Sequence, residues 1–305
     1  MSLEEQIKKT NIITKKSIVT VGTFDGVHIG HQSLFQTLRR ESKKNGANSI
    51  AIVFKEKPRA IIKKEQNKLY LTTFAERKKL ISKHVDYIIP IDFNQSIQNL
   101  KSTQFIQILK NNINTIAIVS GDNAKIGSDQ KLIKSIDKNL IKVINSRIKE
   151  NSGEIFSSSN IKKSIAFGKF EKTTEMLGRY YKISGKVVSG KKRGRLLGFP
   201  TANIKPSKEL LIPCKGIFAT IAMIKNTNFL SGTSIGYNPT FEEEEKISIE
   251  TFIIDFNEDL YNQKISLNFI SKIREEKKFE STKDLIKQMD SDISYIKKIP
   301  IPITK

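Results

Sequence analysis

Short apolar runs alternate with segments of helical periodicity through the first half of the chain. The runs are typical of buried strands, and the segments between them repeat apolar residues every three or four positions. The predicted strands cover residues 18–21, 49–54, 86–91, 115–120 and 140–144, and the predicted helices cover 33–44, 74–84, 103–111 and 130–136. Strands that alternate with helices indicate an α/β fold with a parallel, doubly wound sheet.

The pattern changes to closely spaced β-type runs in the second half. These runs cover residues 183–188, 216–224, 229–236, 247–255 and 264–270. Short strands separated by turn residues predict a small antiparallel β-barrel. A final helix is predicted over 281–297, with Leu285, Met289 and Ile293 on one face. The change falls between residues 166 and 179, so we predict domains at 1–170 and 171–305.

The segment between the first strand and the first helix has the strongest candidate chemistry. Gly22, Gly26 and Gly30 allow sharp turns and a close approach of the backbone to a ligand. If the helix begins at Gly30, His28 and His31 can face the same bound group. Ligands of open α/β sheets bind where strands end, and the N-terminus of a helix favours anions there. Two imidazole N–H groups can stabilise an oxygen that gains charge in a transition state.

Residues 22–31 read G-T-F-D-G-V-H-I-G-H. This string resembles the H-x-G-H signature of the nucleotidylyltransferase superfamily, and in particular its FAD synthetase branch. The resemblance implies that His28 and His31 stabilise the α-phosphate of ATP as pyrophosphate leaves. It also implies nucleotide binding by the surrounding residues Gly22, Phe24, Asp25 and Gly30.

Two further strand ends carry partial matches to the same family. Residues 53–58 read V-F-K-E-K-P, where the family has F-x-P-H-P, so Lys57 stands in the place of a histidine. Residues 121–127 read G-D-N-A-K-I-G, where the family has G-x-D-F-x-F-G, so Asn123, Ala124 and Ile126 are departures. The resemblance implies flavin binding by Phe54, Pro58 and Asn123.

A serine run precedes a predicted helix that begins near Asn160. Hydroxyls and free N–H groups at a helix start can cap the helix or hold a phosphate. Residues 157–162 read S-S-S-N-I-K and resemble the S-S-T-x-I-R motif that grips the ATP phosphates. The resemblance assigns this role to Ser157, Ser158 and Lys162, the last in place of an arginine.

A glycine-rich, basic stretch over residues 190–203 is the main candidate site of the barrel half. Its backbone N–H groups can wrap phosphates, and the oxygens of Thr201 and Asn203 suit Mg²⁺. The stretch resembles the riboflavin kinase signature, including its P-T-A-N core. Further segments similar to that family cover residues 216–219, 236–241 and 274–279. The residues that this resemblance assigns to nucleotide binding are Gly190, Gly194, Arg195, Gly198 and Thr201.

Glu250 is the candidate general base of the barrel half. It lies within a predicted strand, where an inward carboxylate needs a reason. The catalytic glutamate of the resembled family occupies this position and accepts the proton of the substrate hydroxyl. The resemblance also implies that Arg274 contacts the flavin.

The charge of the chain does not by itself indicate a nucleic-acid-binding protein. The formal net charge is +22, but only nine of the 53 basic residues are arginine, the residue suited to bidentate phosphate contacts. We therefore expect no nucleic-acid partner, although the excess charge would attract ATP. One cysteine, the absence of an apolar run of membrane-spanning length and the polar first residues predict a cytoplasmic protein without a membrane partner.

Together the two resemblances imply a bifunctional riboflavin kinase/FAD synthetase. Its substrates and products would be ATP, riboflavin, FMN and FAD, with Mg²⁺ as cofactor, and we expect a monomer or weak homo-oligomer. Three alternatives stay open: a riboflavin kinase whose first domain no longer makes FAD, a nucleotidylyltransferase for another phosphorylated substrate, and a basic RNA-binding module.

Overall fold

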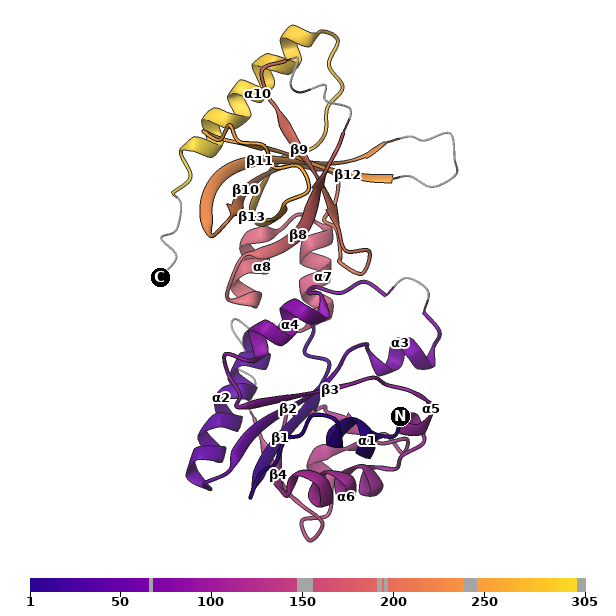
Figure 1. Cartoon of the computed structure of the whole chain (residues 1–305). Coiled ribbons are helices and arrows are strands. Elements are labelled where there is room, and N and C mark those ends of the chain that lie inside the picture. The colour runs from indigo at the N-terminus through magenta and orange to yellow at the C-terminus, as the bar shows by residue number, and fades with distance from the viewer. Residues whose placement is uncertain (66–67, 147–155, 191–193, 195–196, 239–245, 301–305) are drawn as a thin grey trace. The chain divides into compact units, whose positions relative to one another are not determined.

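The computed structural model describes residues 1–65, 68–146, 156–190, 194, 197–238 and 246–300. The chain divides into two units, Met1–Ser158 and Ser159–Lys305 (Figure 1). The first unit is an α/β sheet with helices, and the second is a β-barrel with helices, so the predicted fold class is confirmed.

The first unit is built on a five-stranded parallel sheet in the order β3-β2-β1-β4-β7. Its strands are β1 (Ser17–Gly22), β2 (Asn48–Phe54), β3 (Tyr87–Ile91), β4 (Thr115–Ser120) and β7 (Lys142–Asn145). Its helices are α1 (Leu3–Lys8), α2 (Ile29–Lys44), α3 (Pro58–Ile62), α4 (Phe74–Ile81), α5 (Gln95–Gln98) and α6 (Ser102–Ile113). Because all five strands are parallel, their carboxyl ends meet at one edge.

Helices cover both faces of this sheet, as its continuously apolar strands require. Val19 of β1 packs in one core with residues of α1 and α6. The preceding residue, Ile18, packs in a second core with residues of α2 and α4. Successive side chains of a strand point to opposite faces, so β1 packs against the helices on both faces of the sheet. This packing fixes the position at which β1 ends.

One predicted helix of this unit is wrong. Residues 130–136 form part of a short hairpin, β5 (Lys125–Ile126) with β6 (Lys131–Leu132), followed by a single 3₁₀ turn over Ile133–Ser135. The apolar residues that imitated a helical repeat, Ile133 and Ile136, pack into the core from this irregular segment. Local spacing cannot separate these two cases when the segment is so short.

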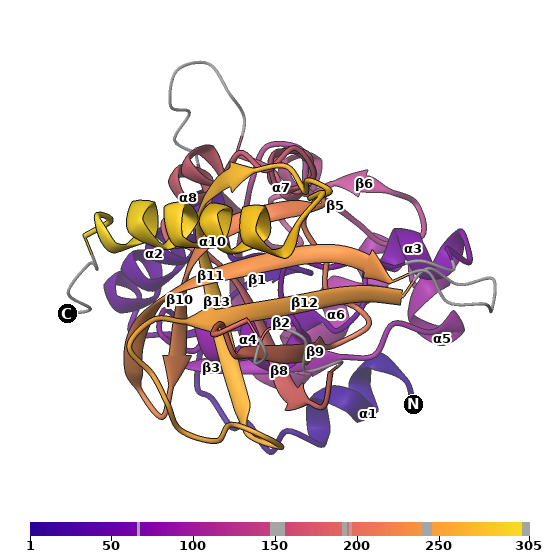
Figure 2. The ribbon, with the colours of Figure 1, turned by 90° about the horizontal axis from the view of Figure 1, so that it is seen from above.

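The second unit is a closed antiparallel barrel in the order β10-β11-β12-β9-β8-β13. Its strands are β8 (Tyr181–Val188), β9 (Thr201–Pro206), β10 (Gly216–Ile224), β11 (Thr227–Asn238), β12 (Lys246–Ile253) and β13 (Lys264–Arg274). The helices are α7 (Ser158–Ala166), α8 (Phe170–Leu177) and α10 (Thr282–Lys297), the last lying beside β11 on the outside of the barrel (Figure 2).

The barrel interior combines an aromatic cluster with buried hydroxyls. Phe170 of α8 stacks on Phe269 at 5.1 Å between ring centroids and meets Phe218 edge-on at 5.6 Å. The Thr233 hydroxyl is fully buried and hydrogen-bonds those of Thr220 and Thr251 at 2.7 and 3.0 Å. Since Phe170 fills the barrel core, α8 packs as part of this unit.

Candidate functional site

The loop between β1 and α2 lies at the carboxyl edge of the parallel sheet. Phe24, Gly26 and Val27 have φ values of 51°, 80° and 43°. Only Gly26 of the three predicted turn glycines has a positive φ, and the backbone strain falls on Phe24 and Val27 instead. A β-branched residue is rarely left-handed, and such strain collects at ligand sites. Gly22 keeps the start of the loop narrow, because a Cβ there would lie 2.9 Å from the Phe24 ring.

His28 and His31 lie together at the start of α2. The helix begins at Ile29, so His28 is its N-cap and Gly30 is buried in its first turn. The two imidazole rings are stacked with centroids 3.7 Å apart and planes inclined by 23°. Phe24 meets the ring of His31 edge-on at 5.3 Å. The predicted convergence of the two histidines is therefore present in the structure.

His31 is a neutral imidazole near pH 7. Burial, the neighbouring His28 and the charge of Arg77 together hold the pKa of His31 well below its usual value of 6.5. Its Nδ1 is buried and has no hydrogen-bond partner among the residues described. A neutral imidazole can still donate one N–H to a ligand oxygen, so His31 can offer a directed hydrogen bond rather than a charge.

Asp25 joins three segments at this edge. Its Oδ1 accepts a hydrogen bond from the Leu71 N–H at 2.8 Å, and its Oδ2 lies 3.0 Å from the ammonium of Lys57. Its main-chain carbonyl accepts a hydrogen bond from the hydroxyl of Ser158 at 2.8 Å. The predicted nucleotide-binding residues Asp25 and Ser158 therefore touch, although 133 positions separate them in the sequence.

Arg77 of α4 connects the two loops that follow β1 and β2. Its side chain is fully buried, and its guanidinium donates to the carbonyls of Thr23 at 2.8 Å and Lys55 at 2.9 Å. It also lies 5.4 Å from the ring centroids of Tyr70 and Phe74. This planar, many-donor group can join two loops at once. Sequence reasoning missed Arg77, because an arginine in a run of four charged residues, such as residues 76–79, is usually exposed.

The remaining predicted residues of the first domain are less closely grouped. Phe54 ends β2 and meets Phe93 edge-on at 5.6 Å, and Pro58 is the first residue of α3. Asn123 is exposed in the turn after β4. Ser157 directly precedes α7, which carries Lys162 into the second unit. Their proposed roles stay predictions.

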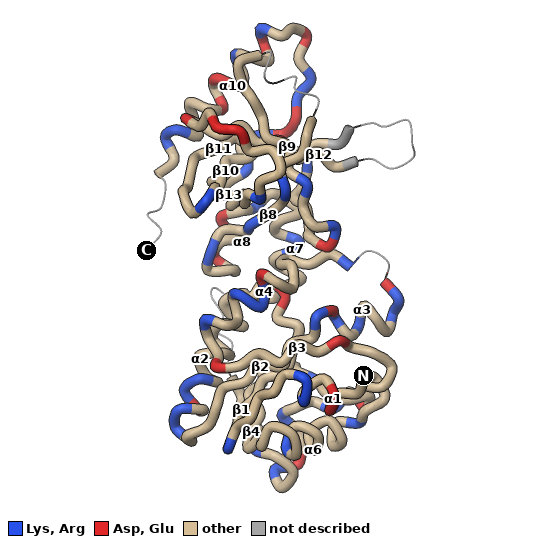
Figure 3. Tube along the Cα trace, in the orientation of Figure 1, with Lys and Arg blue, Asp and Glu red and all other residues tan. Residues whose placement is uncertain are grey.

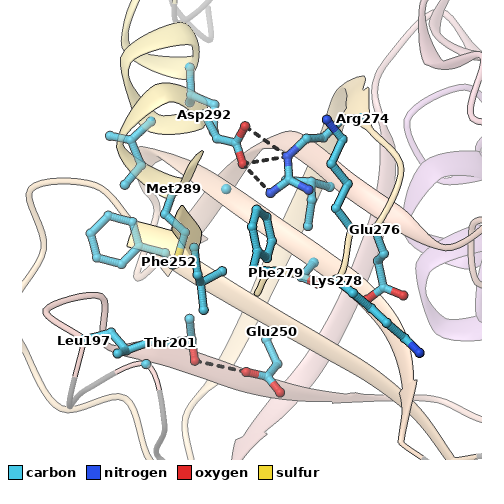
Figure 4. A pocket seen from close by; sticks show the side chains of 18 residues that line it. Leu197, Thr201, Glu250, Phe252, Arg274, Glu276, Lys278, Phe279, Met289 and Asp292 are labelled. Carbon is cyan, nitrogen blue, oxygen red and sulfur yellow. Dashed lines mark hydrogen bonds and ion pairs between the residues drawn. The ribbon is translucent and has the colours of Figure 1, made fainter. Parts of the chain in front are cut away.

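A cavity of about 640 Å³ lies on the outside of the barrel, against α10 (Figure 4). Residues of β10, β12, the segment after β13 and α10 supply its apolar lining, including Ile217, Phe252, Phe279, Met289 and Ile293. The apolar face predicted for the last helix, Leu285, Met289 and Ile293, therefore lines a pocket. A largely apolar pocket with a few polar groups at its edges suits a planar organic ligand.

Glu250 lies at the edge of this pocket, but not inside the barrel. Its neighbours Ile249 and Thr251 are buried at 2% and 0% exposure, so strand alternation turns Glu250 outward into the pocket. The expectation of an inward carboxylate is thereby corrected. The Glu250 carboxylate accepts a hydrogen bond from the hydroxyl of Thr201 at 3.2 Å (Figure 4) and another from that of Ser248 at 3.1 Å.

Thr201, Asn203 and Glu250 share one face of adjacent strands. Asn203 of β9 is the register partner of Glu250, and Thr201 lies two positions before it. Sequence patterning missed β9, because its first residues belong to the glycine-rich stretch over 190–203, which is typical of a loop. No group of three His, Cys, Asp or Glu side chains that could hold a metal occurs in the described part of the chain. The hydroxyl, amide and carboxylate oxygens of this face nevertheless fit the hard-donor preference of Mg²⁺.

The glycine-rich stretch approaches the same face. A Cβ on Gly190 would collide with the Asn203 amide, and one on Gly194 would collide with the carbonyl of Phe199. Gly198 has a φ of 84° and is exposed, so it takes a conformation that L side chains rarely adopt. Arg195 lies outside the described residues.

Arg274 lines the far end of the pocket in an ion pair with α10. Its guanidinium donates from Nε at 3.0 Å and from Nη2 at 2.8 Å to Asp292 Oδ2 (Figure 4). Its Nη1 donates to the carbonyl of Glu275. Gln288 donates to the same carboxylate. The predicted flavin contact is therefore also the anchor of α10, a role that sequence reasoning missed because Asp292 is polar and lies on a helix.

Basic residues are spread over both units, with acidic residues between them (Figure 3). No helix among the described residues is both long enough and apolar enough to cross a membrane. The tertiary structure thus gathers the candidate chemistry at the sheet edge and in the barrel pocket.

Comparisons with known proteins match both units. The FAD synthetase family matches residues 10–160, and the riboflavin kinase family matches residues 177–300. A bifunctional riboflavin kinase/FMN adenylyltransferase of Buchnera aphidicola subsp. Schizaphis graminum is 34% identical, over 98% of this chain and 98% of its own length. The protein of the same name from Listeria monocytogenes is 29% identical, over 90% of each chain.

The fold also agrees with a solved structure along most of the chain. A protein described as a macrolide-efflux protein of Streptococcus pneumoniae has a TM-score of 0.88 and 28% identity, over 93% of this chain and 95% of that one. An α/β unit with an H-x-G-H helix start, followed by a kinase barrel, defines a two-domain nucleotide-dependent transferase. The chain belongs to the family of bifunctional riboflavin kinase/FMN adenylyltransferases.

Arg77→Met should destabilise the first unit and impair its site together. The substitution keeps an apolar stem but leaves carbonyls of two loops without their donor, at a cost of roughly 2–4 kcal/mol in the free energy of unfolding. Urea unfolding measures that cost, and adenylylation of supplied FMN measures the site. Arg77→Lys should restore part of the stability and less of the activity, because one ammonium cannot span both loops as well. Unchanged unfolding in the Met variant would remove Arg77 from this role.

The pKa of His31 predicts a stability that falls in acid. The folded protein keeps His31 neutral, whereas the unfolded chain binds a proton below about pH 6.5. The free energy of unfolding should therefore decrease as the pH falls below 6.5, by up to about 1.4 kcal/mol per pH unit from this group. Urea unfolding at pH 7.5 and 5.5 measures the decrease. His31→Gln should make it smaller; an equal decrease in both proteins would contradict the assignment.

Proposed function

We propose that this chain converts riboflavin to FMN in its barrel unit and FMN to FAD in its α/β unit, using one ATP for each reaction. The observation that carries the proposal is the pairing of two chemically different sites in one family member. One site has two stacked imidazoles at a helix start, of which His31 is neutral. The other has a carboxylate, hydrogen-bonded to Thr201, at the edge of an apolar cavity.

In the kinase reaction, Glu250 accepts the proton of the ribityl 5′-hydroxyl while the oxygen attacks the γ-phosphorus of ATP. The bond to the β-phosphate oxygen breaks, and ADP leaves. The apolar cavity holds the flavin ring, and Gly190, Gly194, Arg195 and Gly198 hold the nucleotide. Such transfers depend mainly on alignment and charge neutralisation. Thr201 and Asn203 would hold Mg²⁺, which supplies neutralisation of phosphate charge when bound.

In the adenylyl transfer, a phosphate oxygen of FMN attacks the α-phosphorus of ATP. The bond between the α-phosphorus and the bridging oxygen breaks, and pyrophosphate leaves without a covalent enzyme intermediate. His28 and His31 donate N–H hydrogen bonds to the α-phosphate, where charge accumulates in the transition state. Ser157, Ser158 and Lys162 hold the departing phosphates, and Gly22, Phe24, Asp25 and Gly30 hold the nucleotide. Phe54, Pro58 and Asn123 contact the flavin.

A riboflavin kinase without FAD synthesis is not favoured, because the FAD synthetase family match spans the altered loop over residues 121–127. The absence of nucleic-acid and membrane partners, the monomeric or weakly oligomeric state and the cytoplasmic location stay predictions.

The reciprocal loss of two products tests the proposal. Wild-type protein incubated with riboflavin, ATP and Mg²⁺ should yield FMN and FAD, separated by chromatography. Glu250→Gln should lower FMN formation by about 10²–10⁴-fold, as expected for a lost general base, and leave adenylylation of supplied FMN intact. The double variant His28→Ala, His31→Ala should stop FAD formation and spare FMN formation.

Matched variants control for nonspecific effects. Glu258→Gln removes an exposed carboxylate from the same unit, and His84→Gln replaces the third histidine, which packs on Phe35. Both should retain both activities. Wild-type protein that makes FMN alone would support the kinase-only alternative, and wild-type protein that makes neither product would contradict the proposal.

A further inference from the structure

Lys57 occupies a fixed position at the edge of the parallel sheet. It follows β2 and directly precedes α3. Its main-chain N–H donates to the hydroxyl of Tyr70 at 3.1 Å, and its ammonium lies 5.3 Å from the centroid of the Tyr70 ring. The same ammonium lies 3.0 Å from Asp25 Oδ2. Both ends of the residue are therefore held, which reduces the entropy lost when the ammonium binds a ligand.

The partner of Lys57 is itself rigidly held. The Asp25 side chain is only 1% exposed, and its second carboxylate oxygen accepts the Leu71 N–H. A buried carboxylate needs a cationic or hydrogen-bonding partner. Asp25 lies three residues before His28. It therefore positions the Lys57 ammonium at the loop where the adenylyl transfer is proposed.

The ammonium keeps donors for a ligand. Its side chain is 32% exposed, and an ammonium has three N–H donors, so the ion pair with Asp25 does not use all of them. Other titratable groups near this loop differ from Lys57 in their charge or in their hydrogen bonds. His31 is neutral, and the guanidinium of Arg77 donates to main-chain carbonyls. Lys57 thus supplies a positive charge that is both exposed and positioned.

We propose that Lys57 binds the phosphate monoester of FMN, the acceptor in the adenylylation. This proposal rests on the proposed adenylyl transfer. An in-line displacement requires the attacking phosphate and the leaving pyrophosphate to lie on opposite sides of the α-phosphorus. Lys57 lies after β2, between the predicted flavin contacts Phe54 and Pro58, so the phosphate that it binds is assigned to the flavin. An ammonium is a point charge that binds phosphate without a fixed geometry.

The test compares Michaelis constants for the two substrates of adenylylation. Lys57→Gln should raise the KM for FMN about tenfold or more, as expected for the loss of a charge-assisted hydrogen bond. The KM for ATP should stay within about twofold, since charge is lost from one subsite only. Lys57→Arg should keep most of the affinity for FMN because it keeps the charge. Conversion of riboflavin to FMN by the same preparations reports that the rest of the protein is intact.

Lys55→Gln is the matched control. Lys55 directly follows β2, and its ammonium pairs with exposed Asp92 at 2.7 Å rather than with the loop. Its removal should leave the KM for FMN unchanged. If Lys57→Gln unfolds, Lys57→Met keeps the apolar stem of the side chain, removes the same charge and should show the same rise.

An unchanged KM for FMN in folded variants that lack the Lys57 charge would overturn the proposal. A rise confined to the KM for ATP would also overturn it, because Lys57 would then belong to the nucleotide subsite. Failure of the proposed function is a different outcome: the wild-type protein itself would make no FAD from supplied FMN.

Discussion

The guanidinium of Arg77 is the constraint on which the α/β site depends. It lies fully buried in the first unit and donates hydrogen bonds to the carbonyls of Thr23 and Lys55, which directly follow β1 and β2. Parallel strands supply no hydrogen bonds to each other beyond their last paired residues, so the two loops need another connection. Arg77 provides it and brings Asp25 and Lys57, which those loops carry, within 3.0 Å of each other.

The same buried charge affects the chemistry of the histidines. Burial, the neighbouring imidazole and the Arg77 charge lower the pKa of His31, so the stacked pair can pack without repulsion between two cations. In the proposed adenylyl transfer, the site offers anions directed N–H groups and one positioned ammonium instead of a cluster of positive charge. This arrangement agrees with a transition state whose charge develops at one phosphorus.

The barrel also holds charged side chains at its site, but its central group is a carboxylate instead of imidazoles and an ammonium. The carboxylate of Glu250, the proposed general base, lies at the edge of an apolar pocket. Hydrogen bonds from Thr201 and Ser248 orient it, while the Arg274–Asp292 ion pair attaches α10 beside the pocket. Placing a charged pair at the pocket wall costs desolvation free energy, which well-aligned hydrogen bonds offset. The pair therefore defines a single position for the helix.

The sequence by itself determined the fold class, the alternation of β1, β2, β3 and β4 with helices, and the motifs at their ends, because periodicity and short glycine-rich strings are local properties. The helix predicted over residues 130–136 was wrong, because two isoleucines at helical spacing can also pack from a hairpin. Only the tertiary structure decided that Glu250 faces outward, that Arg77 is buried and that Lys57 meets Asp25. Those facts depend on which distant segments become neighbours, and no local pattern encodes the partner of a single charged side chain.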